Sequence, residues 1–155
     1  MKSLSILILS SLFLVACSSD SSDKKDQIFN SNGIAIDGYD VVAYHEQNEA
    51  KKGTESESVN YEGFTYLFSS TKNRVLFEEN PDKYLPKYGG WCAYAVAETS
   101  TKMSPDPTEW QIQDGELQLF TSSWMTKLTG SLKDDWNEDP KDFKNRADQN
   151  WNKIK

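Results

Sequence analysis

The chain has 155 residues, 17 of them Lys or Arg against 24 Asp or Glu, and its net charge is −7. A surplus of carboxylates repels the phosphates of DNA and RNA, so we expect no nucleic-acid partner. Five Trp, seven Tyr and seven Phe predict a core rich in aromatic side chains.

The N-terminus carries an apolar run over residues 4–16 that follows Lys2 and ends in Leu14-Val15-Ala16-Cys17. The run is shorter than the roughly 20 residues of a membrane-spanning helix, which favours a cleaved leader over a membrane span. This pattern is typical of a bacterial lipoprotein signal. We therefore expect residues 1–16 to be a signal peptide and Cys17 to carry lipid, including palmitate.

The residues after Cys17 define the expected domain organisation and location. Residues 18–26 are Ser, Asp and Lys only, which leaves nothing to bury and predicts a solvated tether. We assign residues 17–30 to the lipidated cysteine and flexible tether, and residues 31–155 to a single domain. Ser18 favours the outer membrane, so we expect a lipid-anchored protein of the bacterial cell envelope that faces the periplasm or the cell surface. The lipid supplies contact with the membrane, and an envelope protein is a candidate partner.

Alternating apolar residues over 59–68 flank Glu62-Gly63 and predict a β-hairpin. A helix is predicted over residues 72–79, with Ser69 or Ser70 as its N-cap. Asn80-Pro81 ends this helix and begins a short turn through Tyr84.

A second hairpin is predicted over residues 110–119, because Asp114-Gly115 suits a two-residue type I′ turn. Two helices are then expected to close the chain. Trp124, Leu128, Leu132 and Trp136 recur every four residues after Ser122 and Ser123, and Phe143, Ala147 and Trp151 repeat this spacing after Asp139-Pro140. These elements predict a small α+β domain in which the two hairpins form an antiparallel sheet packed by helices.

The segment Gly89–Ala95 contains Cys92 between two large aromatic residues and predicts a turn that enters a helix. In the first turn of a helix, the backbone amides and the helix dipole would favour thiolate over thiol at Cys92. The alternative is a cysteine packed between Trp91 and Tyr94 that is inert because it is inaccessible.

Metal binding by Cys92 needs further ligands. Structural zinc takes four Cys or His ligands, which this chain lacks, whereas thiolate and thioether suit Cu(I). A copper site of Cys92 with Met103 or His45 is one hypothesis, and an ordinary surface position for His45 is the alternative. No acid–base pair, nucleophile elbow or phosphate loop supports a hydrolase or kinase, so we expect a protein without enzyme activity unless Cys92 acts in redox chemistry.

Three motifs occur in order along the chain, Asp37–Tyr44, Asn73–Tyr84 and Tyr88–Ala97. Together they resemble the motifs of YHS-domain proteins. This resemblance implies a small α+β module, similar to treble-clef-like metal-binding domains, and a link to copper or other heavy metals. Leu67 stands where the name-giving histidine would be, which removes any metal site that uses that histidine. Selenocysteine at the position of Cys92 in related proteins implies redox or soft-metal chemistry there.

We expect an envelope-anchored YHS-type module that binds a soft metal ion, such as copper, or a small ligand at Cys92. Trp91 is expected beside it, with Tyr39, Asp40 and Tyr94 lining a shallow pocket. In the alternative interpretation of the first motif, Asp40 accepts backbone amides and only shapes a loop. The other functional alternatives are a single-cysteine redox protein and a structural or protein-interaction module with a buried Cys92.

Overall fold

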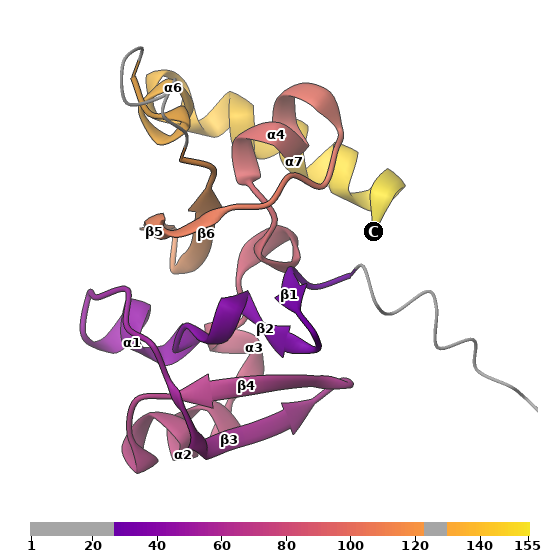
Figure 1. Ribbon diagram of the computed structural model, residues 1–155. Helices are drawn as coiled ribbons and strands as arrows, with labels where there is room; N and C mark the ends of the chain where they lie inside the picture. The colour runs from indigo at the N-terminus through magenta and orange to yellow at the C-terminus, as the bar shows by residue number, and fades with distance from the viewer. Residues whose placement is uncertain (1–26, 123–129) are drawn as a thin grey trace, which may run out of the picture.

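The computed structural model describes residues 27–122 and 130–155, which form two layers (Figure 1). The lower layer holds a four-stranded sheet with short helices, and the upper layer holds a two-stranded sheet with three helices. The predicted signal peptide, Cys17 and residues 18–26 of the tether lie outside the described residues. Within the described ranges, no helix has the length and apolar character needed to cross a bilayer.

The four-stranded sheet has the order β1-β2-β4-β3. Its strands are β1 (Asn30–Ser31), β2 (Ile34–Ala35), β3 (Thr54–Tyr61) and β4 (Phe64–Phe68). The β3–β4 pair confirms the first predicted hairpin, with Tyr61 opposite Phe64. β2 pairs with β4 in parallel, whereas the other two pairs are antiparallel.

The second hairpin is also confirmed, as β5 (Asp106–Gln113) and β6 (Glu116–Phe120). Asp114 and Gly115 have φ of 54° and 80°, as a type I′ turn requires. The prediction that both hairpins share one antiparallel sheet is wrong. β5 and β6 form a sheet of their own, and Leu119 of β6 pairs in parallel with Cys92 on the edge away from β5.

Short helices surround the four-stranded sheet. The predicted helix is α2, which Ser70 caps by accepting a hydrogen bond from the Asn73 amide at 3.2 Å. Asn80-Pro81 ends this helix as predicted. The elements are the 3-10 turn η1 (Ile36–Gly38), α1 (Val41–Glu46), α2 (Thr71–Glu79) and α3 (Pro81–Tyr84).

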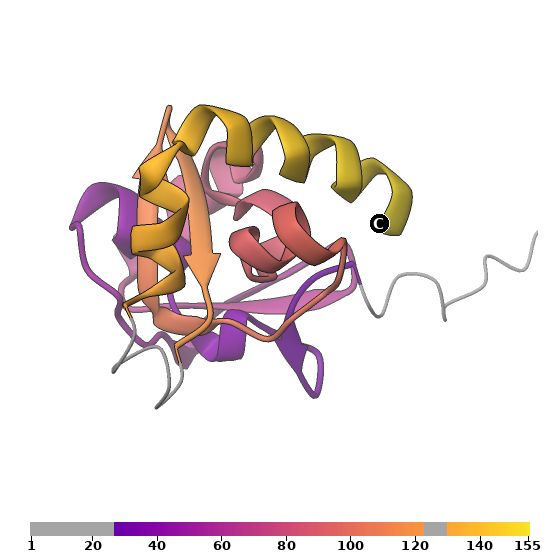
Figure 2. The ribbon, with the colours of Figure 1, turned by 90° about the horizontal axis from the view of Figure 1, so that it is seen from above.

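The upper layer begins with the 3-10 turn η2 (Lys87–Gly90) and α4 (Ala93–Thr99). It ends with α6 (Leu132–Glu138) and α7 (Pro140–Ile154), and α7 runs alongside α4 when seen from above (Figure 2). The helix after Asp139-Pro140 is therefore confirmed.

The first C-terminal helix differs from its prediction. We expected it to run from Ser122 or Ser123 through Trp136, but α6 begins only at Leu132. Ser131 caps it in a capping box with Asp134, and Gly130 before it has φ of 106°, which a helix does not allow. Trp124 and Leu128 lie outside the described residues.

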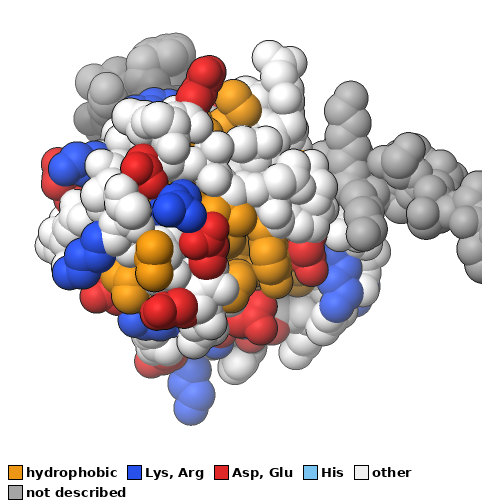
Figure 3. All heavy atoms as spheres, turned by 90° about the horizontal axis from the view of Figure 1, so that it is seen from below, with side chains coloured by type: hydrophobic (Ala, Val, Ile, Leu, Met, Phe, Trp, Pro, Cys, Tyr) orange, Lys and Arg blue, Asp and Glu red, His pale blue; other side chains and the backbone are white. Residues whose placement is uncertain are grey.

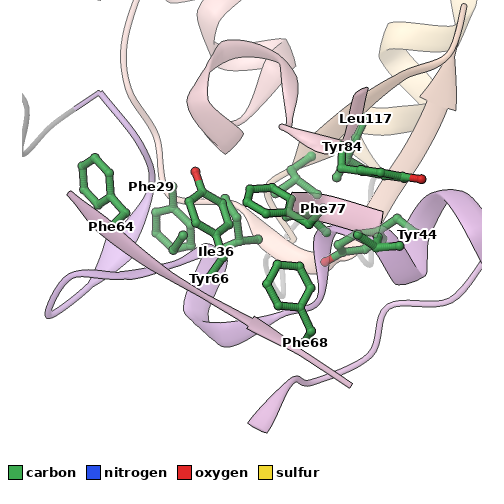
Figure 4. Close-up of a cluster of buried hydrophobic side chains, with 13 residues drawn as sticks. Phe29, Ile36, Tyr44, Phe64, Tyr66, Phe68, Phe77, Tyr84 and Leu117 are labelled. Atoms are coloured by element: carbon green, nitrogen blue, oxygen red, sulfur yellow. The ribbon is translucent and has the colours of Figure 1, made fainter. Parts of the chain in front are cut away.

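The core consists of two clusters of buried side chains. The first lies between the four-stranded sheet and the upper layer, and it is rich in aromatic rings (Figure 4). The second lies under α4, α6 and α7 and contains Tyr88, Phe120 and Trp136. Trp91 packs against both clusters and so joins the two layers.

Seen from below, over β3 and α2, hydrophobic side chains gather near the centre of the face with acidic and basic side chains around them (Figure 3). Val75 of α2 is 39% exposed. Val75 is therefore an apolar side chain that is exposed to solvent.

Candidate functional site

Cys92 lies at the junction of the two layers, where it precedes the first residue of α4. Its side chain is 0% exposed. The sulfur accepts a hydrogen bond from the Thr121 amide at 3.3 Å, and the Cys92 amide donates to the Met103 carbonyl at 3.0 Å. These bonds connect α4 to the end of β6 and to the loop before β5. The thiol is therefore part of the packing and has no access to solvent.

The aromatic neighbours of Cys92 in the sequence pack in different directions. Trp91 meets Phe29 edge to face at 5.4 Å between ring centroids. Tyr94 packs against Phe143 of α7 at 5.3 Å. Both rings are half-buried and help to hold the layers and helices together.

Asp40 is fully buried and holds several backbone and side-chain donors. One carboxylate oxygen accepts the amides of Val42 and Ala43 at 2.9 and 3.2 Å, which caps α1. The other accepts the amide and hydroxyl of Ser69, both at 2.7 Å, and the side-chain amide of Asn73 at 2.6 Å. This geometry matches the loop-shaping interpretation and leaves no oxygen turned toward a ligand.

Tyr39 does not join Tyr94 in one pocket. It packs against the first core cluster, with the Lys52 ammonium 4.1 Å from its ring centroid, whereas Tyr94 packs against the second cluster. The expected pocket of Tyr39, Asp40 and Tyr94 beside Cys92 is therefore not assembled.

The proposed copper ligands do not converge either. Met103 contributes its backbone carbonyl to Cys92, but its side chain is 43% exposed while the thiol is buried. His45 lies on α1 and packs edge to face on Tyr84 at 5.5 Å. Among the described residues, no three His, Cys, Asp or Glu side chains gather to hold a metal ion. The residues around Cys92 do not fit a copper centre.

His45 has a distinctive environment of its own. Its Nε2 atom is buried and has no hydrogen-bond partner in the described part of the chain. Burial lowers the pKa of His45, and the nearby Lys83 lowers it further. Lys83 itself pairs with Glu46 at 2.7 Å. The imidazole is therefore held neutral as a packing element.

The structure contains two left-handed turns, and the sequence predicted a turn at Gly89 but not its left-handed conformation. Ile36, Asp37 and Gly38 all have positive φ, and so do Tyr88 and the two glycines after it. A β-branched residue such as Ile36 rarely adopts this conformation. Gly38 and the Gly-Gly pair were the sequence signals for these turns, but they did not indicate that Ile36 and Tyr88 also have positive φ.

The two turns contact each other through a residue pair distant in the sequence. A Cβ atom on Gly90 would collide with Cδ1 of Ile36, so the isoleucine lies directly on the glycine. The Phe29 amide also donates to the Gly89 carbonyl at 2.8 Å, and the Phe29 carbonyl accepts from Ile36 at 2.9 Å. The first and third motifs thus form one structural unit.

A groove runs past the second turn, between η2 and the C-terminal part of α7. Two adjoining cavities of about 280 and 470 Å³ share four lining residues, Leu85, Pro86, Gly89 and Trp151. Ile28 lines the larger one. This groove is a concave, partly apolar surface, as small-molecule sites usually are.

An ion-pair network includes Lys87 and Glu116, which line the smaller cavity. Lys87 pairs with Glu116 at 2.8 Å and with Asp148 at 3.5 Å, and Lys144 pairs with Glu116 at 2.9 Å. Burial of Glu116 alone would raise its pKa, but the two lysines lower it overall. Tyr88 donates to Asp148 at 3.2 Å, and burial together with that carboxylate raises the pKa of Tyr88. The network ties α7 to η2 and to the β5–β6 turn.

Comparison with protein families matches residues 41–88 to the YHS domain. The match spans α1, the β3–β4 hairpin, α2 and α3, and it ends at the second left-handed turn. YHS domains are often linked to metal binding. No curated protein and no solved structure gives a significant match to the chain.

Proposed function

With a YHS domain over residues 41–88, we propose that the chain is a lipid-anchored binding module of the bacterial envelope in which Cys92 is a structural residue. The burial of Cys92 is the observation that supports its structural role, because its thiol is 0% exposed and accepts a hydrogen bond from Thr121. A metal-binding or redox thiol needs access to an ion or to an oxidant. The lipid anchor is supported by the lipoprotein pattern that ends at Cys17.

The metal alternative is tested by Cu(I) titration in competition with a chromophoric chelator. The full chain with Cys17→Ser keeps Cys92 as its single thiol, and the matched control adds Cys92→Ala. We expect the two variants to take the same amount of Cu(I). Tight binding of one equivalent of Cu(I) that is lost with Cys92→Ala would contradict the structural role and restore the copper-binding hypothesis.

The redox alternative is tested on the same pair of variants. Mild peroxide treatment followed by intact-mass measurement detects oxygen added to sulfur. We expect the folded Cys17→Ser variant to gain no more oxygen than the control without Cys92. Rapid oxidation of Cys92 in the folded protein would favour a single-cysteine redox protein.

The anchor is tested by cell fractionation with labelled palmitate. We expect the wild-type protein to incorporate label and to sediment with membranes, and Cys17→Ser to lose the label. Equal labelling of both chains, or none of the wild type, would contradict the lipid anchor.

A further inference from the structure

The groove beside η2 is a better candidate for ligand binding than Cys92. We propose that it binds a single-chain anionic amphiphile, with the acyl chain along the groove and the carboxylate near Lys102 and Lys155. This inference rests on the proposed function only because it names a ligand for the proposed binding module. It does not depend on Cys92 or on the anchor at Cys17.

The lining of the groove is suited to an acyl chain. Leu85 and Ile28 are partly buried against the first core cluster, and Trp151 packs against the second. These side chains and Pro86 make up the apolar part of the lining of the larger cavity, beside Gln27 and Lys155. Burial of the methylene groups of an acyl chain against such a wall stabilises binding.

Gly89 brings two segments of backbone together at the groove. Gly89 lines both cavities and has φ of 59°. A Cβ atom at this position would collide with the carbonyl oxygen of Gln27. The backbone of Gln27 thus fills the space where a side chain would stand, and the glycine permits this close approach beside the two cavities.

The charges along the groove differ between its two ends. At the end near α3, Lys83 is neutralised by Glu46, and Lys87 is neutralised by Glu116 and Asp148. At the other end, near Trp151, the cationic side chains are Lys102 and Lys155. Lys102 lies 5.6 Å from the Trp151 ring centroid, and Lys155 lines the larger cavity.

No ion pair joins either of these two lysines to a carboxylate within the described ranges. A ligand anion at this end would therefore meet the ammonium groups of Lys102 and Lys155, which are not paired with an Asp or Glu side chain of the described residues. An inorganic anion would leave the apolar wall unused, and a neutral lipid would leave the two lysines unused. A single chain with one negative end uses both.

The location of the groove agrees with such a ligand. Figures 1 and 2 show the C-terminal end of α7 and the start of the described chain on the same side of the molecule. Gln27, the first described residue, lines the larger cavity. In an anchored protein the tether would leave from the groove, which would keep the site near a membrane that supplies and receives acyl chains.

The test is photoaffinity labelling with a diazirine derivative of dodecanoate. The full chain is reconstituted in nanodiscs of zwitterionic phosphatidylcholine, and labelled positions are identified by mass spectrometry. We expect labelling to concentrate around Leu85 and Trp151 and to be removed by excess dodecanoate. Labelling spread in proportion to surface exposure would overturn the proposal.

Competitors separate the ligand classes. Dodecyltrimethylammonium has the same chain with a cationic end, and inorganic phosphate has an anion without a chain. We expect neither to compete as well as dodecanoate. Equal competition by the cationic amphiphile would contradict the role of the two lysines. Displacement of the probe by phosphatidylglycerol in the nanodisc, but not by dodecanoate, would make the membrane surface the occupant and overturn the proposal.

Variants locate the two ends of the ligand. Lys102→Glu is expected to weaken competition by dodecanoate about tenfold, and Lys51→Glu, at an exposed position in another part of the fold, is expected to leave it unchanged. Leu85→Glu is expected to abolish groove labelling, and Val75→Glu is its control. Unchanged labelling in both groove variants would contradict the proposal.

The same labelling is repeated with Cys17→Ser and with Cys92→Ala. We expect groove labelling to persist in both. A failed anchor test or a copper site at Cys92 would then be recognised independently of the result for the groove.

Discussion

At the scale of single residues, Asp40 shows how one carboxylate can organise several segments. It joins the start of α1 to the end of β4 and the first turn of α2 through Val42, Ala43, Ser69 and Asn73. Every one of these partners is a hydrogen-bond donor. The site therefore requires a group that only accepts hydrogen bonds, which a carboxylate satisfies.

Asp40→Asn is predicted to destabilise the fold although it preserves shape. The new NH₂ group would face the donors of Ser69 and Asn73, which leaves buried donors unpaired at a cost of at least about 2 kcal/mol. Urea unfolding measures this change in the free energy of unfolding. Asp82→Asn, at an exposed position, is the control and should change it little. Equal stability of Asp40→Asn and wild type would show that the hydrogen bonds are not as described.

His45 predicts a pH dependence of stability. Its pKa is lowered from 6.5 by burial and by Lys83, so the unfolded chain binds a proton first as the pH falls. The contribution of neutral His45 is fully present above the unfolded pKa and is lost as the pH falls toward the folded pKa.

The free energy of unfolding should therefore decrease between about pH 7.5 and pH 5.5, above the range in which carboxylates titrate. His45→Phe keeps a ring against Tyr84 and removes the titrating group, so its stability should stay level over this interval. The same slope in both proteins would assign the effect to another group.

At the scale of elements, local capping determines where the helices begin. Ser131 accepts from the Lys133 amide at 3.2 Å, and its own amide donates to Asp134 at 3.3 Å. Ser131→Ala should lower the free energy of unfolding by about 1 kcal/mol, and Ser131→Gly by only a few tenths. Thermal unfolding of the two variants checks this order. A larger loss for the glycine variant would contradict a capping role.

The elements that could be predicted from the sequence are those with local signals. Both hairpins follow from alternating apolar residues and turn pairs, and Ser70 and Asp139-Pro140 mark helix starts. The α6 boundary was mispredicted because a four-residue spacing of apolar side chains continued across Gly130, whose positive φ breaks the helix. The parallel β2–β4 pairing could not be predicted, because it depends on contacts between distant segments and leaves no periodic signal.

At the scale of the whole molecule, the two left-handed turns join the N-terminal segment to the centre of the chain. Ile36 rests on Gly90, and Trp91 packs against both core clusters. From the sequence we expected residues of these motifs to line a pocket around Cys92. In the structure these motifs contact each other as two turns. The collision that a Cβ atom at Gly90 would cause is visible only in the folded backbone.

A double-mutant cycle tests this contact. Gly90→Ala should be strongly destabilising, by more than about 2 kcal/mol, since it adds a Cβ atom against Ile36 at a positive φ. Ile36→Val removes the Cδ1 atom that would collide, so the double variant should lose less stability than the sum of the single variants. Additive losses in urea unfolding would mean that the two residues do not touch.

The central claim is that Cys92 is a structural residue, and the rate of its alkylation by iodoacetamide tests this most directly. The measurement uses the full chain with Cys17→Ser, at increasing urea. We predict native labelling at least about 100-fold slower than in the unfolded chain, rising in parallel with unfolding. Rapid labelling of the native protein below pH 7, before any unfolding, would contradict the claim and identify Cys92 as an accessible, reactive thiol.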